Sequence, residues 1–514
     1  MRRPRQGSLL LLALVTSAGI STLLSVGLLR TMNDTAIARR AATQQRALAL
    51  AEAGLDAGVQ WLLAEDERPV CSDEFAVEGQ QCASLTSAFT PELGGIIQTF
   101  PGSGSFTVTV DPDDLNEAEP AQAAFTITAS GTTTGIAVTR TAAMTIKRES
   151  FSKYLMFWNK YKKGQAINMT GAEVLRGPVH VNDNLYIMGS PTFLGPVSYT
   201  GAIVCTSAPC NPTYAELPQK LEKPIPMPEA KKRFDEDLVP AAKASGIVIG
   251  DDAVVRFEQH PIDLLQPDGP QRYELVVTGK GVDEVKLKGN KLAPTPNAAD
   301  PSILEVRYTI AGKLVILGKE ELTVEDSILH GQVTLASQED MTIQGHIIYA
   351  CNPDSVNADG TPVTDEDRQN NPACDNGESR DLLGLVSRKD IIVDTSDETK
   401  FPDRVHLPDP ARPPIGIMIQ GSVMALRTFT VKGAYKKDDS DERARIGYKG
   451  RLHLFGGLIQ DERGLVGWNI DAKTGAGDGF DKDYVYDARL LRLAPPSFPN
   501  TGRYDFVAWA EQRP

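Results

Sequence analysis

Apolar residues run without a charge from Gly7 to Leu29 and then give way to a periodic pattern. At about 1.5 Å of rise per residue, a helix from Ser8 to Leu29 is long enough to cross the hydrocarbon of a bilayer. The chain then continues in good helix formers without proline until Pro69. Apolar residues recur in this part at steps of three and four, at Leu48, Ala51, Leu55, Val59 and Leu62. We therefore expect one helix over residues 8–64, apolar all round in its first half and amphipathic in its second.

This N-terminal pattern differs from that of a cleaved secretory signal. Such a signal has an apolar core of about 7–15 residues and is followed by mature protein of unrelated pattern. Here the apolar run is longer, and the helix continues beyond it. A single membrane anchor followed by a helical stalk stays open as an alternative to a helix that packs into an assembly.

Between residues 65 and 150 the period of the apolar positions changes from helical to alternating. Three segments show period-two alternation separated by glycine and threonine turns, and they are SFTVTV at 105–110, AAFTITASG at 123–131 and GIAVTRTAAMTIKRE at 135–149. The expected structure is a small antiparallel sheet on which the amphipathic half of the helix buries its apolar face. With the mainly-β part that follows, the fold class predicted for the chain is α+β.

Beyond residue 150 the chain consists of short β-runs separated by glycine and asparagine. Apolar pairs occur at Ile167 and Met169, Val179 and Val181, Leu185 and Ile187, and Val197 and Tyr199. Strands this short and this regular predict a parallel β-solenoid, with a β-sandwich as the alternative. We assign residues 151–210 and 301–514 to the solenoid. Residues 211–300 begin with a proline-rich link and are expected to form an inserted side domain.

Composition and charge are those of a folded, exported, acidic protein. The chain has 514 residues, 41% of them hydrophobic and 23% charged, which are ordinary fractions for globular protein, and its length suggests two to four domains. The formal net charge is −14, and it becomes −17 if Arg2, Arg3 and Arg5 are removed with a leader. Such a surface repels polyanions unless a local basic patch opposes it.

The six cysteines form three close pairs along the chain. The pairs are Cys71 with Cys82, Cys205 with Cys210, and Cys351 with Cys374, and each brackets a polar loop. In an oxidising compartment this arrangement predicts three local disulfides. No pair has the spacing to a second pair or to histidines that a zinc site needs, so we expect no metal and no cofactor.

The N-terminus resembles that of PilX-type minor pilins and pseudopilins. The resemblance rests on the short basic leader MRRPRQG, the apolar run behind it and the helix LALAEAGLDAGVQWL. It implies cleavage by a prepilin peptidase after Gly7, methylation of the new N-terminus at Ser8, residence in the inner membrane and then packing with other pilin subunits in a cell-surface filament. Two positions depart from the family: Ser8 replaces the usual Phe, and the fifth mature residue is Leu12, where major pilins carry Glu.

The later part of the chain is similar to the repeat-like domain that often follows PilX-type N-termini. Phrases such as RGPVHVNDNLYIMGSPTFLGPV and LHLFGGLIQDERGLVGW carry this similarity. It extends to competence pseudopilins with a large β-solenoid, and it implies a subunit of a type IV pilus or related filament. The implied roles are a place at the filament tip, initiation of assembly, and contact with DNA or a surface ligand.

One stretch has the composition of a nucleic-acid site, with basic residues interleaved among aromatic ones. It is KYLMFWNKYKKG, from Lys153 to Gly164. Its candidate DNA-binding residues are Lys153, Trp158, Lys160, Tyr161, Lys162 and Lys163, which could supply phosphate contacts and stacking surfaces. The alternative is that its aromatic residues seal the junction between the head and the solenoid.

A membrane-anchored β-helix enzyme acting on cell-surface polysaccharide is the second functional reading. Asp390 and Asp394 flank the strand IIV, with Arg388 beside them, and paired carboxylates can act as acid and base in glycoside hydrolysis. Exposed aspartates also cap turns in any solenoid. The six histidines, among them His180, lack ligand spacing, and neither a phosphate-binding glycine loop nor a G-x-S-x-G motif occurs. The non-enzymatic reading is therefore preferred.

Overall fold

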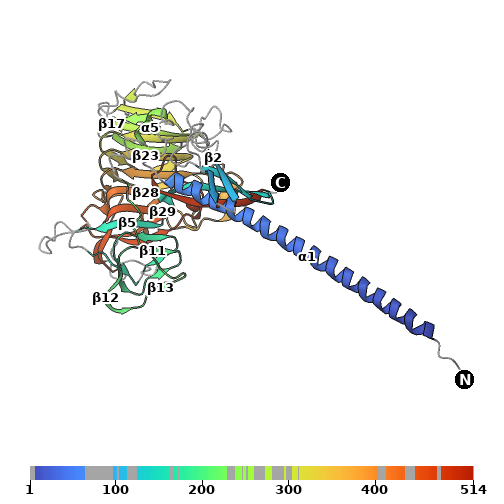
Figure 1. Cartoon of the computed structure of the whole chain (residues 1–514). Helices are drawn as coiled ribbons and strands as arrows, with labels where there is room; N and C mark the ends of the chain where they lie inside the picture. The colour runs from blue at the N-terminus through green and yellow to red at the C-terminus, as the bar shows by residue number, and fades with distance from the viewer. Residues whose placement is uncertain are drawn as a thin grey trace. The chain divides into compact units, whose positions relative to one another are not determined.

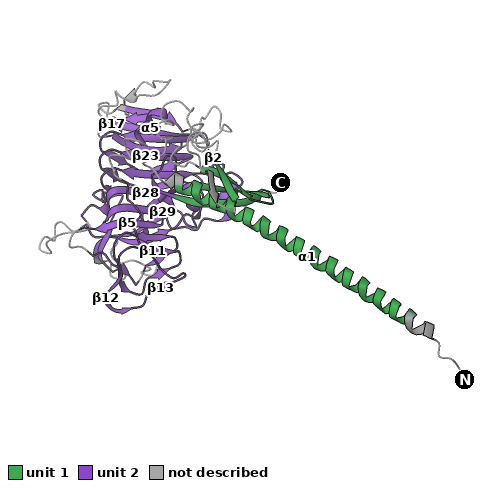
Figure 2. Cartoon of the chain, viewed as in Figure 1, with its two compact units in different colours: residues 1–118, 123–147, 504–514 green, residues 119–122, 148–503 purple. Residues whose placement is uncertain are grey.

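The structure is a computed structural model of the whole chain. The described residues are 6–63, 97–100, 104–112, 124–162, 166–171, 173–228, 238–245, 247–250, 253–259, 272–279, 295–296, 304–310, 312–402, 413–433, 446–471 and 476–512. They fall into two compact units, coloured separately in Figure 2. The first consists of residues 1–118, 123–147 and 504–514, and the second of residues 119–122 and 148–503.

Helix α1 (Gln6–Leu63) is continuous over 58 residues, which confirms the helix predicted over 8–64 (Figure 1). Its apolar side chains between Leu11 and Leu29 are exposed all round, and Leu23 is 75% exposed. Among the described residues, this is the one helix long and apolar enough to cross a membrane. A helix with so much apolar surface needs a lipid or protein environment.

The second half of α1 packs on a five-stranded sheet. The strands, in sheet order, are β1 (Ile97–Phe100), β2 (Gly104–Pro112), β3 (Ala124–Thr133), β4 (Thr139–Ser150) and β32 (Asn500–Gln512). Ala51 and Leu55 of the helix contribute to one buried cluster with Phe106 and Ile127 of the sheet. Gly131 allows the close approach, because a Cβ there would lie 2.2 Å from the carbonyl oxygen of Ala47. The predicted antiparallel sheet is confirmed, with pairing of β1 to β2, β2 to β3, and β3 to β4.

The last strand of this sheet lies at the other end of the chain. We assigned residues 301–514 to the solenoid, whereas β32 occupies the sheet position next to β4. Arg140 pairs with Glu511 near one end of the two strands, and Glu149 lies 3.7 Å from Arg503 near the other. The strands are therefore antiparallel. Local alternation predicts a strand but not its partner, which here is some 360 residues away in sequence.

The second unit is built on ten parallel strands stacked in one sheet. In sheet order they are β15 (Ile247–Ile249), β20 (Lys313–Gly318), β23 (Gln332–Ser337), β26 (Leu382–Ser387), β28 (Ile415–Val431), β29 (Tyr448–Arg463), β5 (Met156–Tyr161), β8 (Val179–Val181), β11 (Val197–Tyr199) and β14 (Gln219–Lys220). This parallel stack confirms the solenoid and not the sandwich.

The order of these strands shows how the chain traverses the stack. It enters in the middle at β5 and runs through β8 and β11 to β14 at one end. It re-enters at the opposite end with β15 and returns strand by strand to β29, which pairs with β5. The central seam between β5 and β29 therefore joins segments about 300 residues apart, and the two predicted solenoid parts form one continuous stack.

Shorter parallel strands form the other faces of the coils. One series is β16 (Ala253–Gln259), β21 (Leu322–Val324), β24 (Met341–Ile343), β27 (Ile391–Val393) and the end of β28; another joins β22 (Ser327–Leu329) and β25 (Ile347–Tyr349) to β28. Two further series follow β5 along the chain. One consists of β6 (Met169–Thr170), β9 (Leu185–Gly189) and β12 (Ile203–Cys210). The other consists of β7 (Val174–Leu175), β10 (Thr192–Phe193) and β13 (Thr213–Tyr214).

The interior of the coils is a continuous apolar core. Val179, Val181, Leu185 and Ile187 are buried in it, as their alternation predicts. Coils this close need glycine where two neighbouring backbones approach each other, as at the pair Gly421 and Gly456 of β28 and β29. Gly456 has φ +146°, and a Cβ there would lie 2.0 Å from the carbonyl oxygen of Gly421 on the neighbouring coil.

The described parts of residues 211–300 do not form a separate side domain. β15 and β16 stack in parallel on β20 and β21, so they complete the end coil of the solenoid. β17 (Tyr273–Gly279) then pairs antiparallel with β16 and with β19 (Leu304–Thr309), beside β18 (Thr295–Pro296). Ile225 of the proline-rich link and Leu238 and Ala242 around helix α5 (Val239–Ser245) are buried in a second cluster on the long sheet.

Candidate functional site

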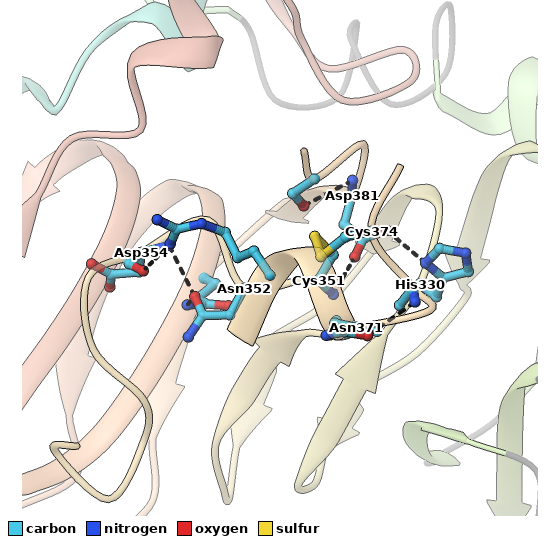
Figure 3. Close-up of a disulfide and its surroundings, with 12 residues drawn as sticks. His330, Cys351, Asn352, Asp354, Asn371, Cys374 and Asp381 are labelled. Atoms are coloured by element: carbon cyan, nitrogen blue, oxygen red, sulfur yellow. Dashed lines mark hydrogen bonds and ion pairs between the residues drawn. A yellow bond between two sulfur atoms is a disulfide. The ribbon is translucent and has the colours of Figure 1, made fainter. Parts of the chain in front are cut away.

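Two places carry the chemistry predicted from the sequence. The first is the start of α1, where Gly7 and Ser8 lie in the first turn and Leu12 is 65% exposed one turn later. The second is a disulfide-closed loop of the solenoid between β25 and β26, shown in Figure 3. We define the disulfide loop as residues 351–374.

Two of the three predicted cysteine pairs are bonded in the structure. Cys351 and Cys374 close the disulfide loop, with 5.0 Å between their Cα atoms, and Cys205 and Cys210 close a turn within β12. Cys71 and Cys82 lie outside the described residues, so their pairing stays a prediction.

Hydrogen bonds from polar side chains fix the two ends of the disulfide loop to the coils. Asp381 is fully buried and accepts hydrogen bonds from the backbone N–H groups of Gly331 (2.7 Å) and Cys351 (3.0 Å). Asn371 donates to the carbonyl oxygen of Ala350 at 2.7 Å (Figure 3). The short helix α6 (Asp365–Asn370) within the loop begins with a capping box. The loop is therefore held in a defined conformation by its disulfide, by hydrogen bonds at both ends and by a capped helix.

A histidine clamped between two carboxylates ties the loop to distant strands. His453 of β29 is buried, with Nε2 2.6 Å from Asp354 of the loop and Nδ1 2.8 Å from Asp483 of β31 (Ala476–Val485). Burial alone opposes the imidazolium charge, but the bonds to Asp354 and Asp483 raise the pKa of His453 to about 9. His453 is therefore protonated at neutral pH and forms a charged bridge.

A second histidine lies at the edge of the loop. Nδ1 of His330 is 3.0 Å from Asp381, and its ring packs on Tyr273 with 4.7 Å between centroids. The neighbouring carboxylate of Asp381 raises the pKa of His330. His330 lines a hollow of about 580 Å³ that also contacts Arg380 and Lys313.

A second hollow, of about 560 Å³, is lined by Asn352, Asp359, Asp367 and Arg368 of the loop. Three of these side chains bond within the loop: Asp359 and Asp367 accept from threonines, and Arg368 pairs with Asp365. Asn352 instead accepts from Gln420 of β28 at 2.7 Å, which joins the loop to the long sheet. The hollow is thus lined by groups that hold the loop together.

The basic and aromatic stretch forms β5, at the central seam of the solenoid. Trp158 is fully buried, with the guanidinium of Arg463 4.5 Å from its ring centroid, and Tyr161 packs between Trp158 and Tyr186. Trp158 is thus part of the core and Tyr161 packs half-buried against it, so the two rings do not form an open surface on which bases could stack.

The lysines of this stretch differ in their surroundings. Lys153 lies 3.1 Å from Glu149, and Lys160 lies 2.7 Å from Asp461, which raises the pKa of Lys160. Lys162 is exposed, and Lys163 lies outside the described residues. The geometry accordingly favours a structural role for the described part of this stretch, in the central seam of the solenoid.

The carboxylates considered for catalysis occupy opposite ends of β27. Asp390 pairs with Arg427, and Asp394 lies 3.0 Å from Lys432. The four residue steps of extended strand from Asp390 to Asp394 place their backbones roughly 13 Å apart, beyond the ~5–9.5 Å of paired glycosidase carboxylates. Arg388 lies 3.4 Å from Glu339. Each group thus has a structural partner of its own.

His180, singled out in the sequence, is fully buried next to the seam. Its ring nitrogens lie 2.7 Å from Ser198 and 2.7 Å from Asn182, and burial lowers its pKa to about 4. Among the residues that the structure describes, no group of three or more His, Cys, Asp or Glu side chains could hold a metal ion.

Sequence reasoning missed the clamp of Asp354, His453 and Asp483. These residues are 99 and 30 positions apart along the chain. Their only local signal is a histidine on an apolar strand. That signal fits many core histidines equally well.

Comparison with known proteins identifies a similar family and a similar solved structure. Residues 121–210, from just before β3 to the end of β12, match a family described as a domain of unknown function, DUF4900. No curated protein matches the sequence. Among solved structures, the chain is similar to the competence-associated pilin ComZ from Thermus thermophilus, at 14% identity and a TM-score of 0.29, over 91% of this chain and 97% of that chain.

Proposed function

We propose that this protein is a pilin-like minor subunit of a type IV pilus or a related filament. One observation carries the proposal: a single helix whose first half exposes apolar side chains all round and whose second half is buried on an antiparallel sheet. A plain membrane anchor needs no rigid continuation into a folded head. A filament subunit does, because its helix must leave the bilayer and pack among other helices.

In this proposal a prepilin peptidase cuts after Gly7, and the subunit waits in the inner membrane until assembly. The solenoid then lies outside the cell, where oxidising conditions suit the disulfides of the chain. Its partners are other pilin subunits. The surface of the solenoid, with its rigid disulfide loop, is offered to a surface ligand or to DNA.

We further propose a place at the filament tip. In pilins, the glutamate at the fifth mature position neutralises the α-amine of an adjoining subunit, and an unpaired charge in an apolar core is costly. Leu12 cannot supply that partner. A subunit that starts the assembly has no subunit above it, and the large unit of residues 148–503 is not crowded there.

The test is to shear filaments from cells that express the full chain and to identify proteins by mass spectrometry and N-terminal sequencing. We expect the chain in the filament fraction, beginning at Ser8. A chain that begins at Met1 or beyond Ala18, and that never accompanies filaments, would return the assignment to a membrane anchor.

A further inference from the structure

Between the apolar run and the head, α1 has an exposed segment that we call the stalk, residues 30–46. At about 1.5 Å per residue it spans roughly 25 Å. Its side chains are exposed except Thr43, which is half-buried, and burial on the sheet begins at Ala47. The stalk carries four arginines and one aspartate, and two of the arginines, Arg39 and Arg40, are adjacent.

Arg39 and Arg40 have no acidic partner on their own helix. An ion pair on a helix surface needs an acid three or four residues away. The positions at that spacing hold only alanine, threonine, isoleucine and glutamine: Thr35, Ala36, Ile37, Ala42, Thr43 and Gln44. Arg30, in contrast, has Asp34 four residues on. Within the described part of the chain, no ion pair involves either Arg39 or Arg40.

The position of these arginines also opposes the usual charge bias of membrane proteins. Basic residues close to a membrane helix are enriched on the cytoplasmic side. In the orientation proposed above, the leader with Arg2, Arg3 and Arg5 is cytoplasmic, so Arg39 and Arg40 lie on the exported side. An arginine pair retained there points to a partner on that side.

Charge indicates what that partner is. After cleavage at Gly7, residues 8–46 carry a net charge of +3, whereas the remaining 468 residues carry −20. The basic stalk of one subunit is therefore complementary in charge to the acidic globular part of another. The helix itself has no acidic residue at the spacing that would pair with Arg39 or Arg40. The alanines around the pair, Ala36, Ala38, Ala41 and Ala42, leave room for another surface to approach closely.

We infer that Arg39 and Arg40 form the docking site for carboxylates on the surface of an adjacent filament subunit. The guanidinium groups bind carboxylates in a bidentate manner, which fixes the register of the stalk against its neighbour. This inference rests on the proposed function, since it needs a neighbouring subunit. Anionic lipid headgroups are the competing occupant.

The test compares paired variants of the full chain in cells that make filaments. The charge reversal is Arg39→Glu with Arg40→Glu, the conservative pair is Arg39→Lys with Arg40→Lys, and the control is Arg176→Glu with Lys223→Glu, two exposed positions of the solenoid. The readout is the amount of chain in sheared filaments relative to the processed chain in membranes. We expect the reversal to lower this ratio about tenfold or more, the effect of losing about 1.4 kcal/mol of binding. The control pair should stay within about twofold of wild type. The lysine pair keeps the charge but not the bidentate geometry, so its ratio should fall between those of wild type and the charge reversal.

A photo-reactive residue at Ala36 of the otherwise wild-type chain provides a second measurement that does not depend on how the variants fold. In sheared filaments we expect an adduct with a protein subunit through an acidic peptide. Unchanged incorporation of the charge reversal, or adducts with lipid only, would overturn the inference while leaving the proposed function intact. Absence of the wild-type chain from filaments would overturn the proposed function itself.

Discussion

The side chain of Asn182 binds both backbone polar groups of Ile225. Its Nδ2 donates to the carbonyl oxygen of Ile225 at 2.5 Å, and its Oδ1 accepts from the N–H of Ile225 at 2.8 Å. Asn182 follows β8 at the central seam, whereas Ile225 belongs to the proline-rich link. An asparagine amide thus takes the place of a neighbouring strand and fastens the link to the solenoid.

Replacing Asn182 by Leu should release this link. The buried N–H and carbonyl of Ile225 would lose their partners, at a cost of roughly 1–3 kcal/mol of unfolding free energy each. The measurement is urea unfolding of the detergent-solubilised full chain. Asn211→Ala, at an exposed position, is the control. Equal midpoints for Asn182→Leu and wild type would show that the link is held by its apolar contacts alone.

The clamp around His453 predicts a loss of stability at alkaline pH. The pKa of His453 is raised to about 9 in the folded state, so its contribution is fully present below about 6.5, the pKa expected when unfolded, and is lost as pH rises through 9. Unfolding midpoints measured from pH 6 to pH 10 should fall more steeply for wild type than for His453→Asn.

His346 supplies a control of opposite sign for this measurement. Burial lowers the pKa of His346, so its contribution is lost as pH falls below 6.5, not as it rises. His346→Asn should therefore leave the alkaline limb unchanged. Parallel wild-type and His453→Asn profiles between pH 7 and pH 10 would contradict a charged clamp.

The two observed disulfides should differ in their effect on stability. Cys351 and Cys374 are 23 positions apart and Cys205 and Cys210 only five, and a longer closed loop constrains the unfolded chain more. Replacing each pair by Ala should lower the unfolding free energy by about 3 and about 2 kcal/mol, respectively. A non-reducing peptide map should also show Cys71 joined to Cys82. Crossed pairs or free thiols would contradict the local pairing.

A tip position predicts where antibody binds on filaments. Labelled antibody against the solenoid should decorate one pole of sheared filaments, because nothing adds above a subunit that begins the assembly. Deletion of the chain should lower the number of filaments more than their length. Decoration at regular intervals along the shaft would place the subunit elsewhere in the filament.

The sequence allowed the elements to be predicted where their periodicity is local. Leu48, Ala51 and Leu55 mark the face of α1 that meets the sheet, and the alternation at Val179 and Val181 marks a solenoid strand. The candidate DNA-binding surface could not be predicted correctly from the sequence. The rings of Trp158 and Tyr161 look like a stacking surface in sequence, but Trp158 is buried in the seam between β29 and β8, and Tyr161 packs half-buried beside it.

By itself, the sequence determined the long helix and the period-two strands, because each depends on neighbours within a few residues. The acidic net charge and the spacing of the cysteines are properties of the sequence itself. Only the tertiary structure decided that β32 joins the first sheet, that β5 pairs with β29, and that Asp354 meets His453. These contacts join segments about 100 to 360 residues apart. Alternation sets which face of a strand is apolar, but it carries no information on which other strand completes its hydrogen bonds.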